Sequence, residues 1–191
     1  QPTDETLDRI YGEHYYDAWG LRTDEATVEI LKRGTFTRII RGLGPLRTGA
    51  RVLDCGAATG FLMRVARDAG YEAYGIELSE FGANKIAEVF GRDRVHQGHL
   101  EDAPFPDGHF DAIFMCDFLE HVRDPERILR RAHALLAPGG KIAISTPRVG
   151  SFTHAAMGLK WTHYKVEHLY YFSLKKDRKS TRLNSSHLGI S

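Results

Sequence analysis

Apolar residues follow two different spacings along the chain. From Thr23 to Leu43 they recur at a mostly helical spacing, and Gly42, Gly44 and Pro45 then interrupt the pattern. This arrangement predicts one long helix over Thr23–Leu43.

Beyond residue 50, short apolar runs alternate with longer segments of helical spacing. The predicted strands cover residues 51–54, 72–77, 94–97, 110–115 and 141–145. The predicted helices cover residues 59–69, 79–90 and 124–136; Ser79 is the expected N-cap of the second, and Pro138, Gly139 and Gly140 end the third. Strands that alternate with helices predict βαβ units and a parallel sheet, which is the α/β fold class.

In a parallel sheet of this kind, ligands bind outside the carboxyl ends of the strands. Four chemically distinctive segments fall at those ends: residues 54–60, residue 77, residues 98–101 and residues 116–121. We therefore expect the functional site at this edge of the sheet.

Composition and charge narrow the classes of partner. The 191 residues are 42% hydrophobic and 27% charged, as expected of one soluble globular domain. The formal net charge of +1 gives no strong field, so we expect neither nucleic acid nor a membrane surface as a partner. Cys55 and Cys116 form no disulfide framework, which fits a reducing, cytoplasmic location. No apolar run is long enough for a membrane span.

A turn of small residues follows the first strand in VLDCGAATGFL, residues 52–62. Its pattern is D-x-G-x-A-x-G, whereas the dinucleotide fingerprint requires a small residue where this chain has Phe61. A pyrophosphate site, and with it a nucleotide-dependent oxidoreductase, is therefore disfavoured. The alternative is that the glycines serve only a tight turn from strand to helix.

Glu77 ends the next strand, in YGIELS. An acid at this place, about 20 residues beyond the glycine turn, can accept hydrogen bonds from both hydroxyls of a ribose. A solvated carboxylate at a strand end is the alternative interpretation.

Four segments together resemble class I S-adenosylmethionine-dependent methyltransferases: VLDCGAATGFL, YGIELS, GHLEDAPFPDGHFDAIFMCDFLEHV and LLAPGGKIAISTP. The resemblance runs from about Ala50 to Pro147, and more loosely to Ser173. Within the family it is greatest to small-molecule enzymes of the ubiquinone-biosynthesis O-methyltransferase type. It implies a Rossmann-like class I methyltransferase fold, with helices on both faces of a mostly parallel sheet, and S-adenosyl-L-methionine as cofactor.

The resemblance also implies cofactor-binding positions. Gly56, Ala57 and Gly60 would wrap the methionine part of the cofactor, Asp54 would support that turn, and Glu77 would take the ribose. The other implied contacts are Ala58 and Phe61 in the turn, Leu78 on one adenine face, the backbone N–H of Leu100, the backbone carbonyl of Cys116, and Asp117 near the amino group and the sulfur.

One residue departs from the family pattern. Where the family usually has an acid to accept from the adenine amino group, this chain has His99. Either a neutral imidazole nitrogen accepts there, or Glu101 or Asp102 replaces it after a local shift.

His121 in FLEHV is the candidate general base, because an imidazole titrates near neutral pH and lies next to the edge where the methyl group is expected. The alternative is a histidine that hydrogen-bonds the loop or the helix start. Glu120 is expected to orient a neighbour or cap a helix, and the spacing of His, Cys and Asp suggests no closed zinc site, so no metal ligand is assigned.

Two aromatic segments lie outside the predicted sheet, at Tyr11–Gly20 and Phe152–Phe172. Rings near the mouth of a site could sandwich a planar acceptor, or they could pack ordinary helices.

The last residues, DRKSTRLNSSHLGIS, differ in character from the rest of the chain. Read as codons, they resemble a translated sequencing adapter, so we expect a non-native tail at 177–191. Ordering such a tail costs more conformational entropy than burial of its few apolar residues offsets, unless its backbone also pairs with the edge of the sheet.

The expected organisation has three parts. Residues 1–45 form an N-terminal helical segment that acts as a lid, and residues 46–176 form the cofactor-binding domain. Because the family's sheet usually finishes with a hairpin and the chain starts at Gln1, we expect truncation at both ends.

The expected function is methyl transfer from S-adenosyl-L-methionine to a small molecule, with a hydroxyl oxygen as the favoured acceptor. The alternatives are a Rossmann-type nucleotide-dependent oxidoreductase and a non-catalytic cofactor-binding fragment. The residues do not indicate the acceptor's identity or an oligomeric state.

Overall fold

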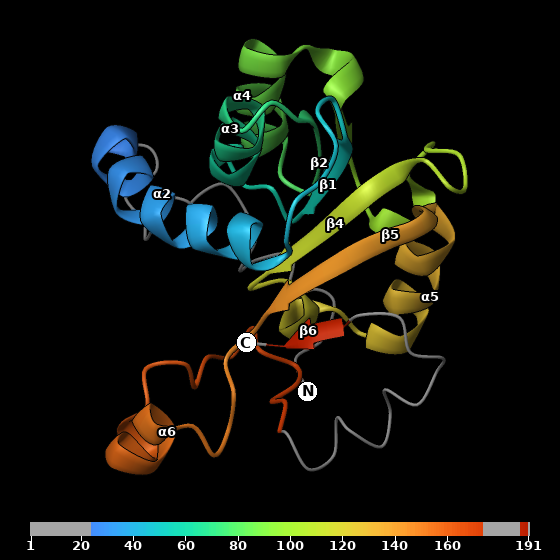
Figure 1. Cartoon of the computed structure of the whole chain (residues 1–191). Helices are drawn as coiled ribbons and strands as arrows, with labels where there is room; N and C mark the ends of the chain where they lie inside the picture. The colour runs from blue at the N-terminus through green and yellow to red at the C-terminus, as the bar shows by residue number, and fades with distance from the viewer. Residues whose placement is uncertain (1–23, 174–187, 191) are drawn as a thin grey trace.

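The computed structural model describes residues 24–173 and 188–190. Its centre is a six-stranded sheet in the order β3-β2-β1-β4-β5-β6, with every neighbouring pair parallel (Figure 1). The strands are β1 Arg51–Cys55, β2 Glu72–Glu77, β3 Val95–Gln97, β4 Phe110–Cys116, β5 Leu136–Ser145 and β6 Leu188–Ile190. The chain order reverses between β1 and β4, so the ligand-binding crevice of such a sheet is expected there.

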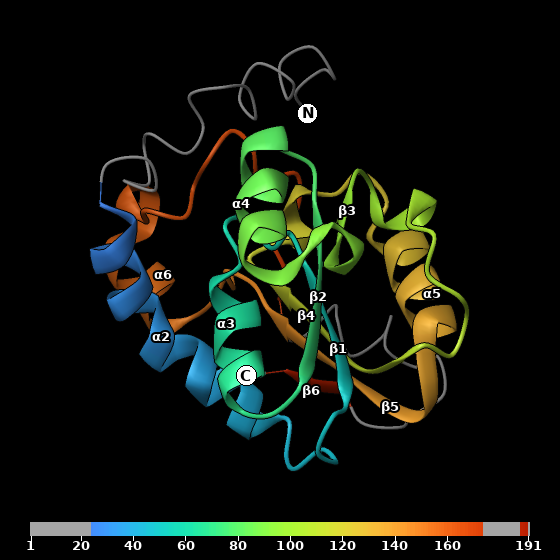
Figure 2. The ribbon, with the colours of Figure 1, turned by 90° about the horizontal axis from the view of Figure 1, so that it is seen from above.

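Helices cover both faces of the sheet. Figure 2 shows α2, α3 and α4 on one side of the strands and α5 on the other. The α-helices are α2 Glu25–Gly42, α3 Phe61–Asp68, α4 Glu80–Phe90, α5 Pro125–Leu135 and α6 Phe152–Met157. Short 3₁₀ turns are η1 Arg92–Arg94, η2 Leu100–Asp102, η3 Leu119–His121 and η4 Gly158–Lys160. Among the described residues, no helix has both the length and the apolar character that crossing a membrane requires.

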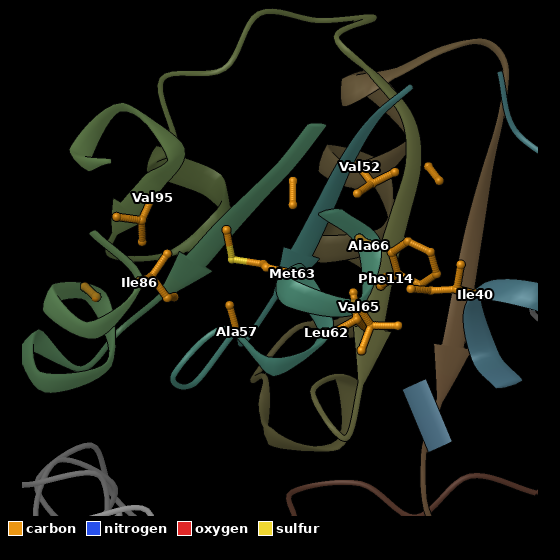
Figure 3. Packing of buried hydrophobic residues seen from close by; sticks show 13 residues of the cluster. Ile40, Val52, Ala57, Leu62, Met63, Val65, Ala66, Ile86, Val95 and Phe114 are labelled. Carbon is orange, nitrogen blue, oxygen red and sulfur yellow. The ribbon is translucent and has the colours of Figure 1, made fainter. Parts of the chain in front are cut away.

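The central strand β4 is buried on both faces, which explains its nearly continuous apolar sequence. Phe114 packs with residues of α2, α3 and α4, whereas Ile113 and Met115 pack with residues of α5. Figure 3 shows the first of these clusters, with Phe114 close to Ile40 and Ala66. The two clusters hold the sheet between two helical layers.

The predicted α/β class and Rossmann-like architecture are confirmed, and the predicted strands and helices are all present near their predicted bounds. One boundary was wrong. β5 starts at Leu136 rather than Lys141, and the proline and glycines that were expected to end α5 lie inside this strand. The cause is an irregular register, in which Phe110 pairs with Leu136 but Ala112 pairs with Lys141.

The predicted N-cap at Ser79 is correct in position only. Its side chain makes no capping hydrogen bond to α4. Asp24 and Asp124, by contrast, cap α2 and α5 through their carboxylates, which accept from Thr27 N and Arg127 N respectively. The start of α4 is held in a different way, by a buried acid of β2 described below.

The described part of the N-terminal segment lies against α3. Arg64 of α3 approaches the carboxylates of Glu25 and Glu29 within 3.4 and 3.8 Å, and Arg33 pairs with Asp68. Ile40 completes the contact inside the core. The proposed lid role of residues 1–45 stays a prediction, since residues 1–23 lie outside the described part of the chain.

Part of the unusual tail joins the sheet. The backbone of Leu188–Ile190 pairs in parallel with Ile142–Ile144 of β5. This is the edge pairing that could offset the cost of ordering the tail. The expected hairpin after the fifth strand would be antiparallel, so β6 is not that hairpin.

We predict that deleting residues 177–191 leaves the unfolding midpoint nearly unchanged. Ordering three edge residues costs about 1–2 kcal/mol each, and edge hydrogen bonds return about 0.5–1.5 kcal/mol each, so the terms nearly cancel. A net change below about 1 kcal/mol shifts the midpoint by less than about 4 °C. Thermal melts of both chains test this. A larger drop on deletion, or slow amide exchange at Leu188–Ile190, would show that β6 stabilises the fold.

Candidate functional site

The carboxyl ends of the central strands lie side by side, as the sequence predicted. Cys55 of β1 aligns with Ile76 of β2 and Met115 of β4. The turn that starts at Gly56 therefore lies level with the ends of both neighbouring strands. Asp117, after β4, donates its N–H to Ser145 O at 2.8 Å, which ties β4 to β5 at the same edge.

The turn between β1 and α3 has an unusual backbone. Gly56, Ala58 and Gly60 have φ angles of 75°, 50° and 84°. The N–H groups of Gly56 and Ala57 both donate to Ile76 O, at 2.9 and 3.0 Å, so the turn is fastened to the end of β2. A positive φ is strained for a residue with a Cβ, and Ala58 therefore needs other contacts to stay in this conformation.

Glu77 supplies those contacts. Its Oε2 accepts from Ala58 N and its Oε1 accepts from Ser79 N, both at 2.8 Å. The carboxylate is only 6% exposed, and it joins the glycine turn to the first residues of α4. A carboxylate can accept up to about four hydrogen bonds.

Asp54 lies beside this link at the end of β1. It is 5% exposed. Burial and the negative charge of Glu77 raise the pKa of Asp54 to about 8. Two buried carboxyl groups thus lie close enough to interact at the ends of β1 and β2, and a cation bound nearby would favour ionised Asp54.

Gly82 of α4 permits the close approach of helix and turn. A Cβ at this position would lie 2.5 Å from Ala58 O and 2.8 Å from Glu77 Cγ. The sequence reasoning did not single out this residue. The available signal was a glycine inside a helical pattern, which usually indicates close packing.

Phe118 packs against the turn at Gly56, and it too was missed from the sequence. Its Cδ2 would lie 2.9 Å from a Cβ at Gly56, so glycine is required where the ring rests on the turn. Phe118 follows Asp117, which has a φ of 50° although it is not a glycine. The strained residue lets the chain turn sharply from β4 into η3.

Directly after Phe118 in the chain, η3 carries a polar cluster. Glu120 is 1% exposed and accepts a hydrogen bond from Thr146 Oγ1 at 3.0 Å. His121 Nδ1 lies 3.2 Å from Glu167 O, and the rings of His121 and His168 are 4.7 Å apart. Leu169 N donates to Glu120 O at 2.8 Å, which holds the segment around His168 against η3. Sequence reasoning missed His168 because it lies far along the chain in an aromatic segment.

Burial is the main cause of the pKa shifts in this cluster. It raises the pKa of Glu120 to about 7. Burial, together with the nearby His168, lowers the pKa of His121 to about 4. Burial also lowers the pKa of His168. At neutral pH, therefore, both imidazoles are uncharged.

The remaining predicted positions surround the turn without all meeting at one point. Leu78 is 47% exposed, as a residue that covers a ligand face would be. His99 is exposed, while the Leu100 side chain packs in the core. Cys116 is half-buried and burial raises its pKa, and Asp117 is exposed.

The aromatic segment at 152–172 packs mainly on itself. The buried ring of Trp161 makes edge contacts with His154 and Tyr164, whose centroids lie at 5.0 and 5.4 Å. These contacts favour a packing role for the Trp161 ring over binding of a planar acceptor. The other aromatic segment, Tyr11–Gly20, lies outside the described residues.

These groups fit the cofactor that the sequence resemblance implies. S-adenosyl-L-methionine carries a sulfonium, an ammonium group and two ribose hydroxyls. The buried Asp54 and Glu77 offer the matching negative charge and acceptors. Gly56 is exposed beside Phe118, so the turn presents backbone at the crevice.

Comparison with known proteins agrees with this arrangement. A methyltransferase domain family model matches residues 29–176. The chain is 30% identical to 27-O-demethylrifamycin SV methyltransferase of Amycolatopsis mediterranei (strain S699) over 149 residues, covering 72% of this chain and 53% of that protein. It is 32% identical to ubiquinone biosynthesis O-methyltransferase of Bordetella avium (strain 197N) over 123 residues, covering 59% and 50%.

The fold matches solved structures as well. A crystal structure of a SAM dependent methyltransferase from Archaeoglobus fulgidus superposes with a TM-score of 0.64 at 20% identity, covering 86% of this chain and 71% of that chain. Further relatives are named as N- and C-methyltransferases. The chain spans about half the length of the curated relatives it matches.

Gly82→Ala is predicted to destabilise the protein by about 1–3 kcal/mol, because the new methyl group forces apart α4 and the glycine turn. Gly34→Ala is the matched control. Gly34 is an exposed residue of α2 with nothing near its added Cβ, so this change should stabilise by up to about 1 kcal/mol. Urea unfolding measures both. Equal effects of the two substitutions would contradict the close approach at Gly82.

Asp54→Asn is predicted to flatten the dependence of stability on pH. The pKa of Asp54 rises from 3.8 to about 8 on folding, so its contribution is complete below the unfolded value and is lost as pH rises to 8. The free energy of unfolding should therefore fall more steeply between pH 5 and 8 in the parent than in the variant. Thermal or urea unfolding across this range measures the difference. Parallel profiles would show that Asp54 ionises normally.

Proposed function

Because the chain belongs to the class I S-adenosylmethionine-dependent methyltransferase family, we propose that the protein transfers a methyl group from S-adenosyl-L-methionine to a hydroxyl oxygen of a small molecule. One observation carries this proposal. A buried carboxylate, Glu77, holds the glycine turn after β1, and η3, which carries the neutral imidazole of His121, follows Phe118, whose ring lies against the same turn at Gly56.

The cofactor side of the site is assigned to the residues at the ends of β1 and β2. When bound, S-adenosyl-L-methionine supplies a methyl group attached to a positively charged sulfur. Glu77 accepts from the ribose hydroxyls while its bonds to the turn preorganise the cradle, and Asp54 balances the positive charge. The further proposed contacts are Gly56, Ala57, Ala58, Gly60 and Phe61 around the methionine part, Leu78, His99 and Leu100 around adenine, and Cys116 and Asp117 near the sulfur.

The acceptor side of the site is assigned to η3. Positioning a nucleophile in line with the methyl group can supply about 7–11 kcal/mol of the barrier. His121 is proposed as the base, because its ring is neutral at pH 7 and can take the proton that the hydroxyl loses as the new C–O bond forms and the C–S bond breaks. The contact of Nδ1 with Glu167 O, at 3.2 Å, helps to fix the orientation of the ring.

The choice of oxygen rests on this neutral base and on relatives that are named ubiquinone biosynthesis O-methyltransferase. An amine or carbon acceptor is the main alternative, since relatives of those classes also match. The nucleotide-dependent oxidoreductase is disfavoured because Phe61, the first residue of α3, stands where the dinucleotide fingerprint needs a small residue for close packing of helix against strand. A non-catalytic cofactor-binding chain is the remaining alternative.

The test combines cofactor binding with turnover. Calorimetry with S-adenosylhomocysteine should show binding to the parent and affinity weaker by about 2–4 kcal/mol in Glu77→Ala, which loses charge-assisted acceptors. His121→Ala should bind equally well but turn over about 10²–10⁴-fold more slowly on a panel of hydroxyl acceptors.

Each outcome separates the alternatives. Methylation of amines or activated carbons, but not of hydroxyl compounds, would show that the acceptor atom is not oxygen. Binding without product from any acceptor class would favour the non-catalytic alternative. Equal affinity of Glu77→Ala and the parent would remove Glu77 from the cofactor site.

A further inference from the structure

Three metal-ligating side chains meet around η3, the 3₁₀ turn that follows β4. Glu120, His121 and His168 each offer a ligand atom, and these atoms all lie within 4.8 Å of one another. Two of the residues belong to η3, and the third lies in the segment that follows η4. Hydrogen bonds from Leu169 N and Tyr170 N to Glu120 O, at 2.8 and 3.3 Å, bring the two segments together.

Neighbouring groups hold two atoms of these side chains. Thr146 Oγ1 donates to Glu120 Oε2, and His121 Nδ1 lies 3.2 Å from Glu167 O. Outer contacts of this kind orient ligands and select the histidine tautomer at metal sites in proteins.

Two buried polar atoms of this cluster have no partner. Glu120 Oε1 and His168 Nδ1 have no hydrogen-bond partner among the described residues. Glu120 is only 1% exposed and His168 only 9%. A buried polar atom without a partner costs free energy, so two of them in one group of potential ligands indicate a missing ligand.

We propose that Glu120, His121 and His168 bind one divalent transition-metal ion, with Zn²⁺ as the best-fitting ion. Two imidazoles and one carboxylate form a typical zinc ligand set with an open fourth position, whereas Mg²⁺ and Ca²⁺ prefer oxygen ligands. In a tetrahedral site the ligand atoms lie about 3.3 Å apart, so small side-chain rotations close the cluster onto the ion.

This site goes beyond the proposed function, and metal binding does not depend on it. Its chemical consequence does rest on the proposed function. An acceptor oxygen in the open position would have its O–H pKa lowered by the ion, and its proton would pass to solvent water. His121 would then act as a ligand rather than as the base.

The experiment measures binding directly on the full chain. Chelator-treated protein is loaded with Zn²⁺ or Co²⁺ and freed of excess metal, and bound metal is determined by elemental analysis. We expect one ion per chain, a visible Co²⁺ absorption band typical of a four-coordinate site, and a raised unfolding midpoint. His168→Ala and Glu120→Gln should retain less than about a tenth of the metal, and His133→Ala, an exposed histidine of α5, should retain all of it.

Circular dichroism of each variant establishes that it is folded, and His121→Gln replaces any variant that is not. Absence of stoichiometric metal in the parent, or full retention in folded His168→Ala, would overturn the site and leave a hydrogen-bonded Glu–His cluster. A metal-loaded chain that transfers no methyl group would count against the proposed function alone. Methyl transfer by metal-free protein would support His121 as the base.

Discussion

The buried carboxylate of Glu77 is the interaction on which the rest of the site depends. It accepts from Ala58 N in the glycine turn and from Ser79 N at the start of α4, so one side chain holds two loops that follow different strands. Without it, Ala58 would keep a strained positive φ with less to stabilise it. The absence of a Cβ at Gly82 lets α4 approach close enough for this link to form.

The same carboxylate places a buried negative charge near a second acid, Asp54. Glu77 and Asp54 lie close together in a place from which water is excluded, and the result is a carboxyl group at Asp54 that resists ionisation. A cationic cofactor would relieve this strain, because its charge favours the ionised carboxylate. The protein without cofactor is therefore less stable at neutral pH than it would be if Asp54 ionised normally. This loss of stability accompanies a binding site whose charges are arranged before the cofactor binds.

The polar cluster that begins on η3 has a different physical basis. Glu120 and His121 lie on η3 directly after β4, but the group that completes their cluster, His168, comes from a distant segment. Burial keeps both imidazoles neutral. A neutral imidazole is able to take a proton and is also able to bind a metal ion, so the same geometry supports both the proposed base and the proposed metal site.

The sequence by itself determined the fold class and the edge of the sheet that carries the site. Apolar periodicity and the order of strands and helices are local properties, and a parallel sheet always gathers the carboxyl ends of its strands. Asp54, the turn at 56–60 and Glu77 were therefore identified correctly as neighbours. Only the tertiary structure decided that Glu77 fastens the turn to α4, that Gly82 and Phe118 enclose it, and that His168 joins Glu120 and His121. These contacts join residues far apart in the chain, and no local pattern records which distant side chains packing brings together.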